Sequence, residues 1–370
     1  MAHEIKRNAT KQIVAASAFT ILVALGMMSG GSALGARGDA HDPLHPPVNA
    51  ITTKILDRMK VLPGDLAPLP AVGVNSAQEQ AQIELGKLLF FDKRLSRDRS
   101  MSCATCHDPG KGFGDGRALA IGFGGKVLAR HSPTVLNAGY NSSQFWDGRA
   151  GSLEEQAAGP IMAAAEMNMA SEQEVVARLN RASAYTERFG SSFGEAPSLK
   201  NIAKAIASFE RTLVTPDSRF DRYLSGNKSA LSEQEKRGLI LFIGKASCSA
   251  CHNGNNLADN KFHVLGGTPN QAEDAGRYAV SKDEKDRGAF KTPTLRNVEL
   301  TAPYTHNGEF KSLEEVIEFY DQGGGEAKNK SELILKLELT KQEKADLIAF
   351  LKSLTGRQPQ VDIPQLPSDN

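Results

Sequence analysis

Apolar residues recur every three or four positions along most of this chain, a spacing typical of amphipathic helices. Six segments also open with a serine or threonine followed three residues later by a glutamate, the pattern of a helix capping box. The six pairs are Ser76/Glu79, Ser152/Glu155, Ser171/Glu174, Ser232/Glu235, Ser312/Glu315 and Thr340/Glu343. Alternating strand patterns are scarce, so we predict a mostly α fold, with loops in the glycine-rich stretches 110–125 and 253–276.

The chain also repeats itself at a constant offset of 160 residues. Residues 133–137 read PTVLN and residues 293–297 read PTLRN, while residues 152–155 and 312–315 are both SLEE. A register kept over such a distance indicates an internal duplication. We therefore predict two tandem domains of the same helical kind.

The first 36 residues have the composition of a secretory signal peptide. Basic residues precede an apolar run of 16 residues, and small residues follow where a peptidase can cut. The alternative is an uncleaved membrane anchor, but a spanning helix needs about 20 apolar residues. We expect a cleaved signal and a mature protein in the periplasm, an oxidising compartment.

Five segments make up the expected chain. They are a signal peptide at 1–36, an irregular proline-rich lead-in at 37–76, an N-terminal domain at 77–220, a C-terminal domain at 221–357 and a disordered tail at 358–370. Lys and Arg number 44 against 43 Asp and Glu, so the net charge of +1 gives no reason to expect nucleic-acid binding. No segment after the signal is apolar enough to span a membrane.

All four cysteines lie in two copies of the motif Cys-x-x-Cys-His. The copies are Cys103–Cys106–His107 and Cys248–Cys251–His252. This is the attachment pattern of haem c, in which two thiols bond the porphyrin and the histidine ligates the iron. Redox-active disulfides do not require the histidine, four-cysteine zinc sites usually place their pairs about 15–20 residues apart, and structural cysteines would not repeat the histidine. We therefore predict one covalently bound haem c in each domain.

The repeat register also suggests which residues lie opposite each iron. At the offset of 160, Pro160 corresponds to Tyr320. If both lie over their irons, the proline leaves the first iron open, whereas the phenol can ligate the second. A tyrosine in the core of its helix explains the pattern equally well. Gln156 and Glu166 flank Pro160 and are candidates to move a proton at an open haem, although their spacing also fits an ordinary helix surface.

A series of motifs over roughly residues 78–355 resembles the bacterial di-haem cytochrome c peroxidase family, which includes the tryptophylquinone-maturing MauG enzymes. The motifs are LGK at 85–87 with LFFD at 89–92, SCATCH at 102–107, SPT at 132–134, FWDGR at 145–149, EM at 166–167, SFERTL at 208–213, CHNG at 251–254, KTPTLRN at 291–297 and TAPY at 301–304. The resemblance implies a mostly α fold of two cytochrome c-like domains, with one haem in each.

The resemblance also implies a role for each candidate residue. By motif, His107 looks like the proximal ligand of a peroxidatic haem, and His252 like that of an electron-transfer haem. Gln156 and Glu166 match the distal glutamine and the acid–base glutamate of the family, and Pro160 matches the residue over the same haem.

Three further positions bear on electron flow. Trp146 matches the residue that lies between the two haems and relays electrons. Phe123 aligns with a histidine that blocks the first iron in classical members, and Tyr320 aligns with a methionine. Both departures resemble the MauG-like branch, and they imply a first haem that reacts without prior reductive activation.

A bound calcium ion is common in the family but doubtful here. Its usual asparagine ligand aligns with His131, and imidazole is a poor ligand for this hard ion, which prefers oxygen. The carbonyl ligands align with Thr301 and Pro303. We favour a hydrogen-bonding role for His131, assign none in catalysis to His306, and expect His263 in a loop or near a haem propionate.

The leading hypothesis is a peroxidase that reduces hydrogen peroxide to water with electrons from a small periplasmic cytochrome c or cupredoxin. The alternative is a MauG-like enzyme that uses a high-valent di-haem state to oxidise aromatic residues of a partner protein. A di-haem electron carrier is the third hypothesis, but it needs no acid–base glutamate. The resemblance is also compatible with a homodimer.

Overall fold

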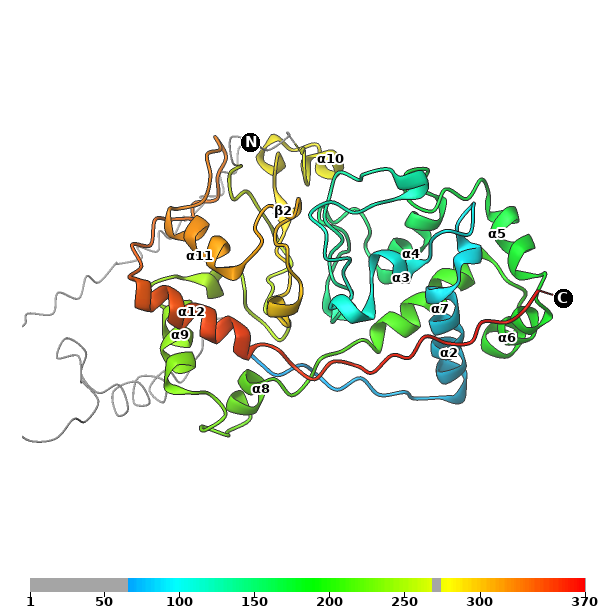
Figure 1. The fold of residues 1–370 in the computed structure, drawn as a ribbon, viewed down its shortest axis with the longest axis horizontal. Coiled ribbons are helices and arrows are strands. Elements are labelled where there is room, and N and C mark those ends of the chain that lie inside the picture. Colours follow the sequence, from blue (N-terminus) through cyan, green and yellow to red (C-terminus); the bar gives the residue numbers. More distant parts are fainter. Residues whose placement is uncertain (1–65, 268–273, 370) are drawn as a thin grey trace, which may run out of the picture. The chain divides into compact units, whose positions relative to one another are not determined.

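Helices and loops make up nearly all of the structure, a computed structural model that describes residues 66–267 and 274–369 (Figure 1). The α-helices are α2 (Ala77–Phe91), α3 (Cys103–Cys106), α4 (Leu153–Met162), α5 (Glu172–Leu179), α6 (Ser183–Phe193), α7 (Leu199–Arg211), α8 (Arg219–Leu224), α9 (Glu233–Ile243), α10 (Tyr278–Ser281), α11 (Leu313–Asp321) and α12 (Lys341–Ser353). Two short antiparallel strands are β1 (Phe262–His263) and β2 (Phe290–Lys291). The mostly α prediction is confirmed. The predicted signal peptide lies outside the described residues, and within these no helix is long and apolar enough to cross a membrane.

Each of the six predicted capping residues begins a helix. In all six, the hydroxyl accepts a hydrogen bond from the amide of the glutamate three residues later. At Ser232 and Thr340 the glutamate carboxylate also accepts from the amide of the capping residue, so the box is reciprocal. These bonds satisfy amides that have no partner within the first turn, so each helix start is encoded locally.

The first hydrophobic core forms where α2 crosses α7. The helices are closest at Gly86, where an added Cβ would lie 1.8 Å from the Ala205 carbonyl oxygen. Beside this crossing, the rings of Phe90 and Phe209 meet edge to face at 5.3 Å. Helices α4 and α6 complete this core by packing on α7 and α2, respectively.

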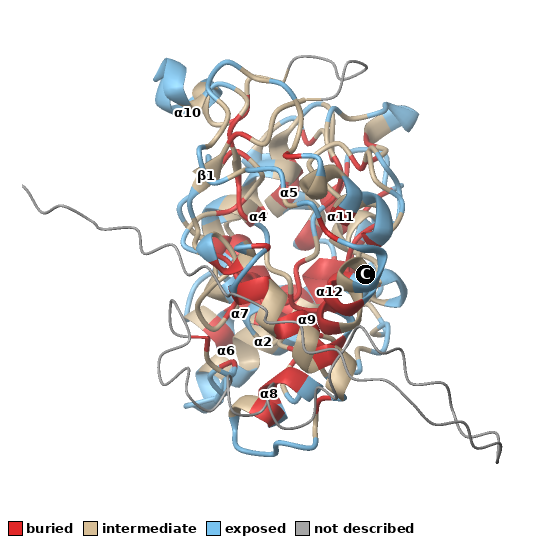
Figure 2. Ribbon diagram, turned by 90° about the vertical axis from the view of Figure 1, so that its left-hand side faces the viewer, coloured by how far each residue is buried: buried red, intermediate tan, exposed pale blue. Residues whose placement is uncertain are grey.

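The second core repeats this arrangement with α9 and α12. An added Cβ at Gly238 would lie 2.0 Å from the Asp346 carbonyl oxygen, and the Phe242 and Phe350 rings lie 5.0 Å apart. Helix α11 packs on α12, as α4 packs on α7. Figure 2 shows buried residues on the packed faces of α7, α9 and α12. The duplication seen in the sequence is therefore a duplication of one helix crossing.

The two cores are joined through Thr215, which is fully buried. Asn137 and Asn297, which correspond at the repeat offset, both adopt left-handed backbone angles, with φ of 60° and 58°. Both side-chain amides donate to the Thr215 hydroxyl. The connecting segment is thus held by the same residue from each repeat.

The predicted boundary between residues 220 and 221 falls inside α8. Phe220 and Tyr223, both on α8, pack in the second core. A boundary before α8, next to Thr215, would keep this helix with the core in which it packs.

The tail also differs from its prediction. Residues 358–369 have no regular secondary structure, yet they lie along the first core (Figure 1). Val361 and Leu366 pack against that core, and the Arg94 guanidinium pairs with Asp369 at 2.8 Å. The proline-rich, polar composition suggested disorder, but two apolar side chains find a complementary surface on the other repeat.

Candidate haem sites

The first haem motif folds as the single turn α3. The Ser102 amide donates to the Thr105 hydroxyl at 2.9 Å and thereby starts the turn. The His107 amide closes it by donating to the Cys103 carbonyl at 3.0 Å. One turn thus holds both thiols, those of Cys103 and Cys106, together with the imidazole.

The second motif is closed in the same way. A 3-10 turn spans Cys248–Ala250, and the His252 amide donates to the Cys248 carbonyl at 2.9 Å. The Cys251 carbonyl accepts from the Asp259 amide at 2.8 Å, which ties the following loop to the motif.

Both motif histidines use one ring nitrogen for a backbone hydrogen bond. Nδ1 of His107 lies 3.3 Å from the Phe113 carbonyl oxygen, and Nδ1 of His252 lies 3.0 Å from that of Leu257. Burial lowers the pKa of both imidazoles, so they are neutral near pH 7. With the proton on Nδ1, Nε2 keeps the lone pair that an iron requires.

The four cysteines suit thioether attachment. All are free thiols. Burial raises the pKa of Cys106 and Cys251 to about 11 and that of Cys248 to about 12, and it raises the pKa of Cys103 further. Surroundings that disfavour a thiolate are compatible with an uncharged thioether sulfur. The motifs therefore fit two covalently bound haem c groups, and the disulfide alternative is not observed.

Glu166 lies near the first motif. It follows α4 in a turn, and its charge contributes to the raised pKa of Cys106. Burial raises the pKa of Glu166 itself, with Arg149 opposing the rise. Gln156 and Pro160 are both half-buried on the preceding helix α4. The carboxyl can therefore hold a proton at a higher pH than an exposed glutamate can.

Tyr320 lies near the second motif. Burial raises the pKa of its phenol, and the thiols of Cys248 and Cys251 add to the rise. Tyr320 stands at the same place on α11 as Pro160 on α4, since both helices begin at equivalent serines. The two repeats thus present different side chains from equivalent helices.

Trp146 lies where the two repeats meet. Its indole N–H donates to the His131 carbonyl at 3.0 Å, and its own carbonyl accepts from the Lys291 amide at 2.8 Å. The ring of His306, its counterpart in the second repeat, lies 6.5 Å away and stacks on Phe290 at 3.6 Å. The predicted relay residue therefore contacts both repeats.

Phe123 and His131 are the two other positions at which the chain departs from the family pattern. The Phe123 amide donates to the Ala165 carbonyl at 3.1 Å, which holds the Phe123 turn beside the segment that carries Glu166. His131 is buried, and its Nδ1 lies 2.7 Å from the Arg117 carbonyl oxygen. This contact fits the hydrogen-bonding role expected for His131, and calcium stays a disfavoured prediction.

A cluster that the sequence analysis did not find lies beside the second motif. Within the described residues, the ligand atoms of Cys251, Asp259 and His263 lie within 4.8 Å of one another, the arrangement of a metal site. His263 Nε2 and the Asp259 carboxylate are 2.8 Å apart. Because Cys251 belongs to the second predicted attachment motif, its sulfur would not be available to a metal ion once a thioether had formed. Asp259 and His263 would then remain as a pair beside that motif.

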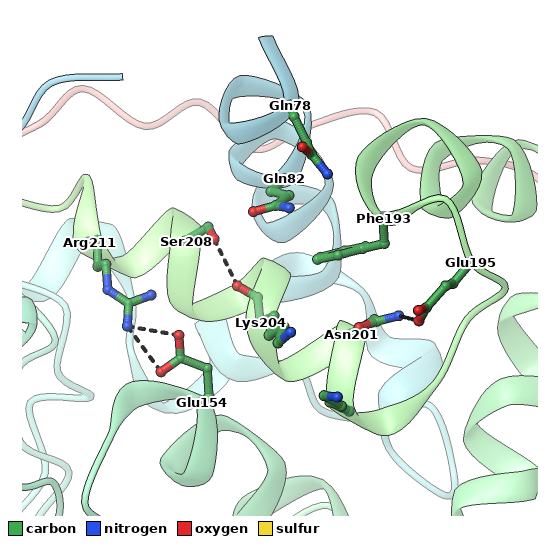
Figure 3. A pocket seen from close by; sticks show the side chains of 10 residues that line it. Gln78, Gln82, Glu154, Phe193, Glu195, Asn201, Lys204, Ser208 and Arg211 are labelled. Carbon is green, nitrogen blue, oxygen red and sulfur yellow. Dashed lines mark hydrogen bonds and ion pairs between the residues drawn. The ribbon is translucent and has the colours of Figure 1, made fainter. Parts of the chain in front are cut away.

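A surface hollow of about 490 Å³ lies over α2 and α7 (Figure 3). It is lined by Gln78, Gln82, Glu154, Phe193, Glu195, Lys200, Asn201, Lys204, Ser208 and Arg211. None of the predicted haem-site residues is among them.

Two covalent-haem motifs in a duplicated helical fold define a di-haem c-type cytochrome. The family model for di-haem cytochrome c peroxidase matches residues 80–229, and the model for cytochrome c matches residues 235–355.

Similar proteins and a similar solved structure support the same family. The chain is 42% identical over 340 residues to cytochrome-c peroxidase IdrP1 of Pseudomonas sp. (strain SCT), covering 82% of this chain and 89% of that protein. It is 42% identical over 288 residues to the methylamine utilization protein MauG of Methylorubrum extorquens (strain AM1), covering 77% and 81%. A crystal structure of a MauG-like protein associated with microbial copper homeostasis superimposes with a TM-score of 0.71 and 34% identity, covering 80% and 95%.

The chain therefore belongs to the di-haem cytochrome c peroxidase family. Members of this family are oxidoreductases of the peroxidase class with two covalently bound haem c groups, and the chain has the attachment residues for both.

Proposed function

We propose that this protein reduces hydrogen peroxide to water at the first haem, with electrons that a small cytochrome c or cupredoxin delivers through the second. The reaction consumes two electrons and two protons for each peroxide and yields two waters. The observation that carries this proposal is a half-buried carboxyl, Glu166, which lies beside the first motif and whose pKa is raised by burial.

The residues of the first repeat have distinct tasks. Nε2 of His107 would hold the iron of a bound haem, and the bond from Nδ1 to the Phe113 carbonyl fixes the ring orientation. When bound, this haem would supply the redox chemistry that cleaves the peroxide bond. The side chain of Pro160 has no atom able to bind iron, so it would leave room for the peroxide. Glu166 accepts the proton from one peroxide oxygen and passes it to the other, and the Gln156 amide donates a hydrogen bond to the separating charge.

The second repeat supplies electrons. Nε2 of His252 and the phenol oxygen of Tyr320 would hold the iron of its haem. Trp146 offers an aromatic group between the repeats, where it bonds to the His131 carbonyl. The segment 1–36 exports the chain to the periplasm, where small electron-donor proteins are found.

The test is steady-state oxidation of reduced cytochrome c by peroxide in wild type and Glu166→Gln. General acid–base catalysis contributes about 10²–10⁴-fold, so the variant should lose that much in kcat/KM while both haems stay attached. In wild type, activity should fall as pH drops through the raised pKa of Glu166, because the carboxylate is the proton acceptor. Glu187→Gln, on the exposed face of α6, is the matched control and should keep full activity. Equal rates in Glu166→Gln and wild type would refute the assignment.

A second function is favoured by Tyr320: oxidation of aromatic residues on a partner protein. An anionic oxygen ligand stabilises oxidised iron, whereas methionine raises the potential. The phenol lies beside Cys248 and Cys251 of the second motif, where it could reach the iron of a haem bound there. A relative that shares 42% identity is named MauG.

Tyr320→Met separates the two functions. After one equivalent of peroxide, this variant should lose the oxidised two-haem species faster than wild type does, as followed by stopped-flow absorbance. Near-zero cytochrome c turnover together with a long-lived oxidised species in wild type would favour the second function. An unchanged decay rate in Tyr320→Met would show that the phenol contributes to neither function.

A further inference from the structure

Glu210 is a buried acid that the proposed reaction does not use. It lies on α7, is only 3% exposed, and its Oε2 has no hydrogen-bond partner among the described residues. Burial raises the pKa of its carboxyl to about 8. A buried carboxyl oxygen without a partner is costly, so its presence calls for a reason other than stability.

The second repeat shows that the fold does not need this acid. Gly86 contacts Ala205 and Phe209 at the first helix crossing, and Gly238 contacts Asp346 and Phe350 at the second. The residue after each of these phenylalanines therefore occupies an equivalent position. In the first repeat it is Glu210, and in the second it is Leu351, which is 6% exposed and packs in the core. The second crossing thus has an apolar residue at this position. The packing of the two helices therefore does not need a carboxyl there.

Glu210 lies near the first haem motif. Cys103 packs against the core that contains Phe209, the residue before Glu210, and the charge of Glu210 adds to the raised pKa of Cys103. Two other charged residues act on Glu210: Arg211 lowers its pKa and Glu154 of α4 raises it. These two pair with each other at 2.8 Å (Figure 3), so their effects on Glu210 oppose each other.

Of the other elements that pack on α7, the turn Ala138–Tyr140 carries the titratable Tyr140, whose hydroxyl donates to the Pro70 carbonyl, and the rest bring buried apolar residues. The buried side of α2 consists of leucines, phenylalanines and Gly86, and that of α5 consists of Val175 and Leu179. Burial therefore dominates the proton affinity of Glu210. The nearest change of charge that it would sense, when the protein turns over, is that of the haem held by Cys103.

We propose that Glu210 is a proton-binding site coupled to the oxidation state of the first haem. When one electron enters that haem, one proton from solvent binds the Glu210 carboxylate and forms the neutral acid. When the electron leaves, the proton leaves with it. The net charge of the buried region then stays the same when the haem is reduced. This lowers the free energy needed to move an electron into a site of low polarity. This inference requires haem at the first motif, but it does not depend on which reaction follows.

The experiment is a redox titration of the intact di-haem protein, without peroxide, at a series of pH values on both sides of 8. Each haem is followed by its own low-temperature EPR signal. The potential of the first haem should fall with rising pH, by at most about 59 mV per tenfold change in proton concentration. The variants Glu210→Gln and Glu210→Leu should both lose this slope, and the leucine copies the residue of the second repeat. The second haem serves as the internal control.

Two further measurements decide the outcome. Redox-difference infrared spectra of wild type should contain the carbonyl band of a protonated carboxyl, and Glu210→Gln should lack it. Glu154→Gln should keep the slope but shift it to lower pH, because a negative charge that raises the pKa of Glu210 is gone. A first-haem potential in wild type that is independent of pH, or a slope that survives in both Glu210 variants, would overturn the proposal.

Discussion

The two repeats agree where backbones touch and differ where side chains face the haem motifs. Gly86 and Gly238 each allow one helix to approach a carbonyl of its partner helix. Asn137 and Asn297 each adopt a left-handed conformation and bond to Thr215. These positions tolerate few residue types, because close approach excludes a Cβ and a positive φ disfavours most side chains.

The differences are concentrated on the haem side. On equivalent helices, Pro160 corresponds to Tyr320, and at the junction Trp146 corresponds to His306. None of these exchanges alters the helix crossings. One scaffold therefore carries two haem motifs. Under the proposed function, a few side chains would give the two haems different tasks: an open iron beside Glu166, and an iron closed by the Tyr320 oxygen.

The largest effect on the scaffold should come from its two glycines. In Gly86→Ala or Gly238→Ala, the new Cβ would lie within 2.0 Å of a carbonyl oxygen, so the helices must separate. Overpacking of this kind costs about 3 kcal/mol, which thermal unfolding of the holoprotein can measure. Gly190→Ala is the control, because its Cβ meets nothing within 4 Å inside α6, and it should be neutral or slightly stabilising. A loss in only one of the two glycine variants would break the equivalence of the repeats.

A smaller effect is expected at the asparagines. Asn137→Gly and Asn297→Gly keep the left-handed backbone but remove the bonds to the buried Thr215 hydroxyl. Leaving a buried polar group with fewer partners costs about 1–3 kcal/mol. Urea unfolding should give losses of similar size in the two variants. Asn137→Ala should be worse than Asn137→Gly by about 1 kcal/mol, because alanine is strained at this φ. If glycine and alanine behave alike, backbone strain is irrelevant there.

Much of this organisation could be predicted from the sequence because its signals are local. Capping boxes mark where helices begin, since hydroxyl and amide lie within four residues of each other. The haem motifs are equally local, and the constant offset of the repeat is enough to pair Pro160 with Tyr320.

Features that the sequence did not indicate depend on distant contacts. Phe220, at the predicted domain boundary, packs in the second core. The pairing of Asp259 with His263 depends on the loop that brings them together beside Cys251, which no spacing rule indicates. In the sequence, Glu210 is one residue of the SFERTL motif, and nothing there indicates that it is buried. Its burial and its counterpart Leu351 are seen only when the two helix crossings are compared.

The smallest effect should come from the tail, where the second repeat reaches the first. A chain ending at Arg357 loses the packing of Val361 and Leu366 on the first core. Both side chains are only half-buried, so we expect a loss of about 1 kcal/mol in the free energy of unfolding. The second haem should be unaffected, because its core contains no residue of the tail. The double variant Val361→Ser/Leu366→Ser in the full chain should reproduce the loss, since it removes the same apolar contacts and keeps the backbone. A truncated chain as stable as the full one would show that the contact is incidental, and the two repeats would then be coupled through Thr215 without help from the tail.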